Sequence, residues 1–120
     1  MIIKKYDTLI YPFKIWIAKD ADGDKLNDMF ELANSDRHPD FNFQIKRFKI
    51  ITTFVCEKKT RNIGAIIYFE KGEKIEAWDV AHEAVHAACF CIEHLGDDIT
   101  HGEPLAYLVE FIVKCYYKTK

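Results

Sequence analysis

The sequence predicts an α+β domain in which a short, mainly antiparallel sheet of about three strands packs against two helices. Three observations lead to this prediction. Segments rich in β-branched and aromatic residues, typical of strands, occupy the first 70 residues. Two helical segments, residues 78–95 and 103–117, follow them. The chain has 120 residues, which is enough for one domain, residues 1–120, with a single core.

The composition indicates a folded protein and argues against two classes of function. Hydrophobic residues make up 49% and aromatic residues 14% of the chain. The formal net charge of -2 offers no basic surface for phosphates, so we expect no nucleic-acid partner. No run reaches the roughly 18 apolar residues of a membrane span, and the N-terminal segment lacks a signal-peptide cleavage site. The oligomeric state stays open.

The four cysteines are Cys56, Cys89, Cys91 and Cys115. No CxxC spacing occurs, and Cys89 and Cys91 point in different directions if both lie on a helix. We therefore interpret the cysteines as small buried hydrophobic residues in a reducing, cytoplasmic environment.

Three strands are expected in the first 70 residues. Residues 9–19 contain alternating apolar positions at Phe13, Ile15 and Ile17, which predicts a strand. Residues 47–57 and 63–70 predict two further strands, joined by a basic turn into a hairpin. Residues 34–44 are interpreted as a polar connection.

An acidic segment precedes the polar connection and partly matches a calcium-binding EF-hand loop. The matching positions 1, 3, 5 and 12 are Asp20, Asp22, Asp24 and Glu31. However, Lys25 replaces the glycine of the sixth position, and a strand precedes the segment where an EF-hand requires a helix. We therefore expect a polar turn and a helix over residues 25–33, capped by Asp24, rather than a calcium site.

The helix expected over residues 78–95 carries the most informative motif of the chain. It contains no Pro or Gly, and Gly96 follows as a stop signal. His82 and His86 are four residues apart, so both imidazoles lie on one face of the helix. With Glu83 beside them they form an HExxH motif, which supplies two nitrogen ligands for zinc and a general base. The alternative is that these side chains line a solvated edge and pair with neighbours.

A second helix is expected over residues 103–117. Thr100 and Glu103 have the spacing of a capping box, and Pro104 suits the first turn. The helix presents an apolar stripe at Leu105, Leu108, Val109, Ile112 and Val113. A six-residue loop joins it to the first helix, so we expect the two helices to be antiparallel.

A zinc ion with two histidine ligands needs a third ligand from the protein. In an antiparallel hairpin, Glu103 and Tyr107 bracket the level of His86, which makes Glu103 the first candidate. Glu110 lies two turns beyond Glu103 on the same face. The remaining candidates lie in the loop between the helices: Asp97, Asp98 and His101.

The HExxH motif followed by Glu103-Pro-Leu-Ala106 resembles the zincin superfamily, in particular its gluzincin branch. The layout is also similar to that of small phage- and mobile-element-associated metallopeptidases of the ImmA/IrrE type. The resemblance covers about residues 78–112. It implies a minimal zincin-like fold, with Zn²⁺ held by His82, His86 and Glu103 and with Glu83 as the general base.

This resemblance implies a minimal zinc-dependent metallopeptidase or related hydrolase that acts on a peptide or protein. Tyr107 or His101 would donate a hydrogen bond to the oxyanion. Residues 63–70, as an edge strand, would bind an extended peptide. The chain departs from the family in being much shorter and in lacking an evident substrate-cleft subdomain. The alternative function is a non-catalytic zincin-like binding or regulatory protein, such as one derived from a phage or mobile element.

Overall fold

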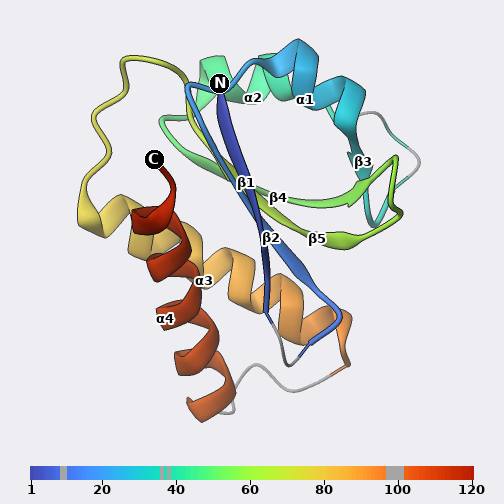
Figure 1. The fold of residues 1–120 in the computed structure, drawn as a ribbon, viewed down its shortest axis with the longest axis vertical. Helices are drawn as coiled ribbons and strands as arrows, with labels where there is room; N and C mark the ends of the chain where they lie inside the picture. The colour runs from blue at the N-terminus through green and yellow to red at the C-terminus, as the bar shows by residue number, and fades with distance from the viewer. Residues whose placement is uncertain (9–10, 36, 38, 97–101) are drawn as a thin grey trace.

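The computed structural model describes residues 1–8, 11–35, 37, 39–96 and 102–120. These residues form a five-stranded mixed sheet and four helices (Figure 1). In chain order the elements are β1 (Ile2–Asp7), β2 (Lys14–Lys19), α1 (Gly23–Met29), β3 (Phe30–Leu32), α2 (Phe41–Arg47), β4 (Ile51–Glu57), β5 (Ile63–Tyr68), α3 (Ala77–His94) and α4 (Gly102–Lys118). The predicted α+β class is confirmed, whereas the expected number of about three strands was too low.

The strands lie in the order β1-β2-β5-β4-β3. β2 and β5 are parallel, and every other neighbouring pair is antiparallel. The predicted hairpin is confirmed as β4 and β5, whose turn closes with the Glu57 amide donating to the carbonyl of Asn62. The expectation that residues 63–70 form an edge strand is wrong, because β5 lies between β2 and β4.

Helices cover both faces of the sheet, so two separate cores form. On β2, Ile15 and Ile17 pack in the core that includes α3 and α4, while Trp16 and Ala18 pack in the core that includes α1 and α2. Figure 1 shows the sheet between these two pairs of helices. Because both faces are covered, β2 and β5 are buried along almost their whole length and are nearly continuous apolar runs.

The contact between β2 and β5 depends on a glycine. A Cβ atom added at Gly64 would lie 1.9 Å from the carbonyl oxygen of Lys14 and 2.8 Å from the ring of Trp16. No side chain fits at this distance, so glycine is needed where the two central strands meet.

Several elements differ from the sequence prediction. The strand expected over residues 9–19 begins only at Lys14, and Leu9 and Ile10 lie outside the described residues. β1 was not predicted, because it is an edge strand whose side chains are mostly exposed and show no strict alternation. α2 was also missed, because its two turns, capped by Asp40, fall in a polar segment too short for a helical period.

The helix expected over residues 25–33 is shorter and begins earlier. α1 ends at Met29, and the chain continues directly into β3. Its cap is Asp22 rather than Asp24, because the Asp22 carboxylate accepts hydrogen bonds from the amides of Asp24 and Lys25 at 3.1 and 3.3 Å.

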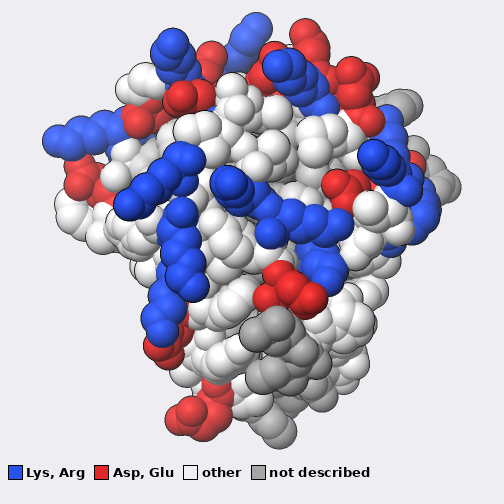
Figure 2. Space-filling model, viewed as in Figure 1, with Lys and Arg blue, Asp and Glu red and all other residues white. Residues whose placement is uncertain are grey.

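The surface carries charges of both signs. Figure 2 shows Lys and Arg side chains on the face viewed, with Asp and Glu side chains among them. Near β1, Lys5 pairs with Glu57 and Lys14 pairs with Asp7. None of the described helices is long and apolar enough to cross a membrane.

Candidate metal centre

The two histidines stand on α3, whose ends are defined by local interactions. At its start, the Glu76 amide donates to the Asp79 carboxylate at 2.9 Å, as in a capping box. The Lys49 ammonium also donates to Asp79, at 2.8 Å, and so joins the segment before β4 to the first turn of α3. At its end, Gly96 has a φ of 78°, which confirms the predicted stop.

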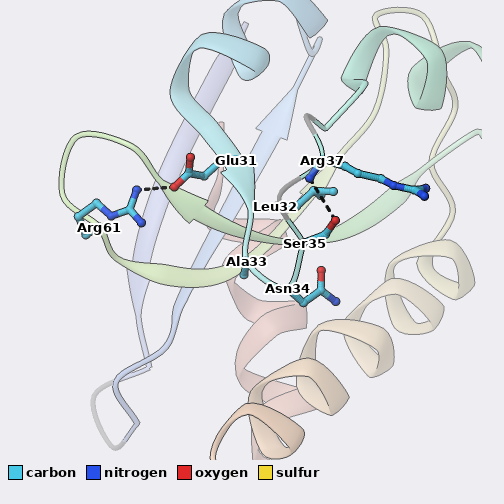
Figure 3. A pocket seen from close by; sticks show the side chains of 7 residues that line it. All are labelled: Glu31, Leu32, Ala33, Asn34, Ser35, Arg37 and Arg61. Atoms are coloured by element: carbon cyan, nitrogen blue, oxygen red, sulfur yellow. Dashed lines mark hydrogen bonds and ion pairs between the residues drawn. The ribbon is translucent and has the colours of Figure 1, made fainter.

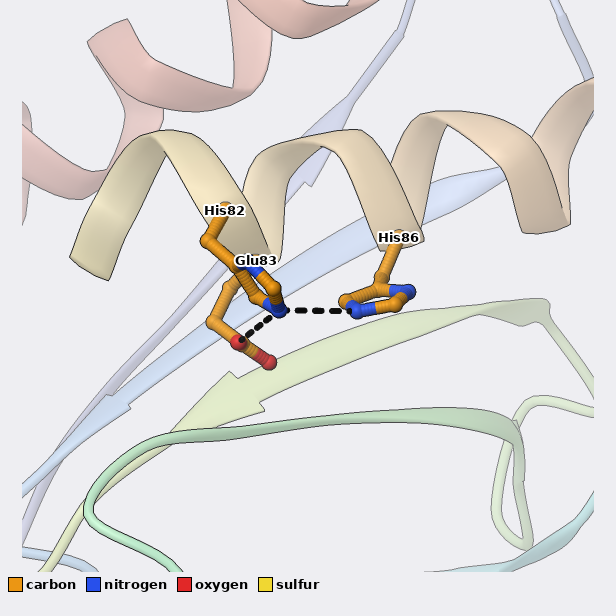
Figure 4. Close-up of side chains that lie close together, drawn as sticks. All are labelled: His82, Glu83 and His86. Atoms are coloured by element: carbon orange, nitrogen blue, oxygen red, sulfur yellow. Dashed lines mark hydrogen bonds and ion pairs between the residues drawn. The ribbon is translucent and has the colours of Figure 1, made fainter. Parts of the chain in front are cut away.

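The two imidazoles face each other across one turn of the helix (Figure 4). Their Nε2 atoms lie 3.1 Å apart, and both side chains are exposed. Two nitrogens bound to a tetrahedral zinc at 2.0–2.1 Å would be about 3.3 Å apart. The ring nitrogens of His82 and His86 are therefore already spaced for one ion.

Glu83 lies beside the histidines but is buried, with 8% of its surface exposed. Its Oε1 accepts a hydrogen bond from the Thr52 hydroxyl at 2.9 Å, and its Oε2 lies 3.8 Å from Nε2 of His82. The Thr52 hydroxyl is also 3.2 Å from the backbone oxygen of Glu83. The second carboxylate oxygen is thus held towards the histidine that would bind the ion.

The three side chains meet in one hollow of about 370 Å³ between α3 and the start of β4. The other residues that line it are Phe48, Ile50, Ile51, Thr52 and Phe90. Among the described residues, this is the one place where three His, Cys, Asp or Glu side chains bring their ligand atoms within 4.8 Å of one another. The donor set of two imidazoles and a carboxylate suits zinc.

The structure does not bring Glu103 to this cluster. Glu103 is exposed in the first turn of α4 and is not one of the groups whose ligand atoms converge. Figure 4 shows the three side chains pointing away from α4, towards the sheet. In Figure 1, α4 crosses α3 obliquely rather than following it along its whole length.

Two further candidates, Glu110 and Tyr107, are also separate from the hollow. Glu110 pairs with Lys114 at 2.8 Å. Tyr107 is 37% exposed and stacks on Phe111 of the same helix, and it does not line the hollow. Three candidates lie outside the described residues: Asp97, Asp98 and His101.

Thr52 contributes to the site but was not recognised from the sequence. It lies between Ile50 and Phe54 on the face of β4 that packs against the core with α3. The sequence signal that could have identified Thr52 is a polar residue at a position of the strand where the alternation calls for an apolar one. Its partner was not foreseeable, because Glu83 is 31 residues away in the chain.

The described cysteines are free and do not join the metal cluster. Burial raises the pKa of the Cys91 thiol to about 12 and that of the Cys115 thiol to about 11. Burial also raises the pKa of Cys89, which lies one turn from His86. Thiols with such pKa values stay protonated near neutral pH, so they are poor metal ligands there.

The acidic segment over residues 20–31 does not form a similar cluster of converging ligand atoms. Asp22 caps α1, Asp24 accepts a hydrogen bond from the Asn42 amide at 2.7 Å, and Glu31 pairs with Arg61. Glu31 and Arg61 line a separate, polar hollow of about 620 Å³, together with Arg37 (Figure 3). No histidine or cysteine is among its described lining residues.

Comparison of the chain with models of known protein families, with curated protein sequences and with solved structures finds no significant match.

Proposed function

We propose that the chain is a minimal zinc-dependent peptidase or related hydrolase, with the ion held by His82, His86 and a third ligand from outside the described cluster, and with Glu83 as the general base. One observation carries this proposal: two imidazole nitrogens 3.1 Å apart adjoin a buried carboxylate in a single hollow. A histidine pair that served only as a solvated helix surface would not need that carboxylate beneath it.

The roles follow from the chemistry of each side chain. His82 and His86 would supply neutral nitrogen ligands. A bound zinc ion would supply Lewis-acid activation of water and of the carbonyl that is attacked. Glu83 would accept the proton of the attacking water and deliver it to the leaving amine. The hydrogen bond from Thr52 would keep the carboxylate in place during both transfers.

The first residues of β4 have no described strand paired on the edge that β3 joins further along, which supports a peptide as the substrate. β3 pairs only with residues from Val55 to Glu57, and the Ala33 amide adds one hydrogen bond to the carbonyl of Phe54. Because backbone groups alternate sides along a strand, those of Thr52 face the same edge as those of Phe54. No described strand lies there, so an extended peptide could pair with β4 beside the histidines.

A second candidate is a non-catalytic binding or regulatory protein. The observation that favours it is the ligand set: within the described part of the chain, Glu83 is the only carboxylate that joins the histidines. A carboxylate used as the third ligand is not available as a base. In that case the zinc would stabilise the fold or a partner surface rather than activate water.

The experiment that decides between the two compares metal content with hydrolysis. Protein purified without chelator is analysed for zinc by mass spectrometry and assayed with a mixture of quenched fluorogenic peptides. We expect His86→Ala to lose zinc, and Glu83→Gln to keep zinc but lose hydrolysis by about 10²–10⁴-fold. The matched control is Glu93→Gln, because Glu93 is exposed on α3 and does not line the hollow.

Each outcome has a definite meaning. Turnover that is unchanged in Glu83→Gln would rule out Glu83 as the base. Zinc that is lost in Glu83→Gln, with no hydrolysis in the unaltered protein, would favour the non-catalytic role with Glu83 as a ligand.

A further inference from the structure

The hollow in front of the histidines has apolar walls both on α3 and in the segment before β4. Phe48 and Ile50 precede β4, and Phe90 lies one turn after His86 on α3. The hollow is open to solvent and holds about 370 Å³. Aromatic and aliphatic walls next to a reactive centre favour an apolar side chain, because its burial removes apolar surface from water.

The two aromatic walls differ in how they are held. The Phe90 ring stacks on Phe54 with centroids 5.5 Å apart and an interplanar angle of 12°. Phe54 in turn stacks on the fully buried Phe13. Phe48 is 48% exposed, with the Arg47 guanidinium 5.5 Å from its ring. The Phe90 wall is therefore supported by the core, while the Phe48 wall presents an exposed apolar surface.

The charges around the hollow disfavour a cationic side chain. Among the described residues that line it, Glu83 is the only carboxylate, and it accepts the Thr52 hydroxyl and faces His82. The Arg47 guanidinium lies over the ring of Phe48 and adds a positive charge beside the hollow. A lysine or arginine side chain placed in the hollow would lose hydration without gaining a free anionic partner.

We propose that this hollow selects a large, uncharged apolar side chain of an extended peptide, and that Phe48 and Phe90 are the residues that determine this specificity. The inference rests on the proposed function for the peptide, whose backbone would pair with the start of β4 at Thr52, where no described strand is paired. Its selectivity comes from the walls of the hollow and not from the metal ligands.

Binding tests this without relying on turnover. The Glu83→Gln protein is saturated with zinc and titrated with blocked, fluorescently labelled hexapeptides that differ at one central position: Phe, Leu, Ala or Lys. Fluorescence anisotropy reports the dissociation constants. We expect the Phe and Leu peptides to bind about tenfold more tightly than the Ala peptide, and the Lys peptide to bind most weakly.

The matched variants are Phe48→Ala and Phe43→Ala, each combined with Glu83→Gln. Both phenylalanines are about half exposed and both lie near the Arg47 guanidinium, but only Phe48 lines the hollow. Phe48→Ala should reduce the preference for Phe over Ala to less than about threefold, whereas Phe43→Ala should leave it unchanged.

The results separate this inference from the proposed function. Equal affinities for all four peptides, or no binding of any of them, would overturn the apolar subsite. An unchanged preference in Phe48→Ala would remove Phe48 from it. If the unaltered protein hydrolyses no peptide but the binding is selective, the apolar subsite stands and the peptidase function is refuted. If peptides are hydrolysed without selective binding, the peptidase function stands and the apolar subsite is refuted.

Discussion

The Thr52 hydroxyl lies 2.9 Å from Oε1 of Glu83 and joins the start of β4 to the glutamate of the HExxH motif. Its neighbours on the same face of the strand, Ile50 and Phe54, pack in the apolar core. A hydroxyl in such surroundings needs a partner, and so does a carboxylate that is 8% exposed. Each group supplies the partner of the other, which orients Glu83 within the hollow.

The first prediction concerns this hydrogen bond. Thr52→Val keeps the shape of the side chain but removes the hydrogen-bond donor to the carboxylate. The free energy of unfolding should fall by roughly 1.5–3 kcal/mol. If Glu83 is the base, kcat should fall by about tenfold or more while zinc content stays the same. Thr52→Ser retains the hydroxyl and should restore most of the kcat. Equal kcat values for the Val and Ser variants would show that the hydroxyl does not position Glu83.

The second prediction is that zinc stabilises the folded chain through the two histidines. Zinc at about 100 times its dissociation constant should add roughly 2.7 kcal/mol to the unfolding free energy and raise the melting temperature by several degrees. Differential scanning calorimetry with and without EDTA measures this. His82→Ala and His86→Ala should abolish the shift. His94→Ala is the control, because His94 lies against Phe13 and Phe54 instead.

The third prediction addresses the ligand set. With Glu103 exposed at the start of α4 and the histidines pointing away from that helix, Glu103→Ala should leave zinc affinity within about twofold of the unaltered protein. Competition with a chromogenic chelator measures the affinity. A loss of zinc in this variant would mean that α4 changes its position when the ion binds, and would support Glu103 as the third ligand.

The fourth prediction is a pH dependence. The hydrogen bond from Lys49, followed by that from the Glu76 amide, lowers the pKa of Asp79 below its ordinary value of 3.8. Because the folded-state pKa is lowered, the stabilisation is present above pH 3.8 and is lost as the pH falls through the lowered value. Asp79→Asn should therefore melt at a lower temperature than the unaltered protein at pH 7, with a difference that narrows below pH 3.8.

The control for this pH dependence is Lys49→Met, which removes the donor with the largest effect on the Asp79 pKa. In that background, Asp79→Asn should change the melting temperature less at pH 7, because the ion pair is already absent. Melting curves recorded at several pH values by circular dichroism measure both effects. An effect of Asp79→Asn that is the same at pH 3 and pH 7 would contradict the assignment.

The fifth prediction concerns the thiols. With pKa values of about 12 and 11, Cys91 and Cys115 are almost entirely protonated at pH 8, and both are buried. Iodoacetamide should therefore label the half-buried Cys89 first in the native protein, and peptide mass spectrometry measures the order. The same treatment in denaturant should label all of them. Labelling of Cys91 as fast as Cys89 would contradict the burial.

Elements that depend on neighbours along the chain were predictable. The helix that carries His82, Glu83 and His86 was expected over residues 78–95 and is observed as Ala77–His94, because its spacing and its stop at Gly96 are local. The hairpin of β4 and β5 follows from two apolar runs and a polar turn. Short or edge elements such as β1 and α2 were missed, because few buried positions were available to show a period.

The α+β class and the pairing of the two imidazoles on one helix follow from local sequence patterns, because a fixed spacing of four residues acts within about one turn. Packing between elements, in contrast, places β5 at the centre of the sheet, brings Thr52 to Glu83 and leaves Glu103 away from the histidines. These relationships join residues of different elements. They depend on which apolar faces pack together and on how α4 crosses α3, and no local spacing specifies either.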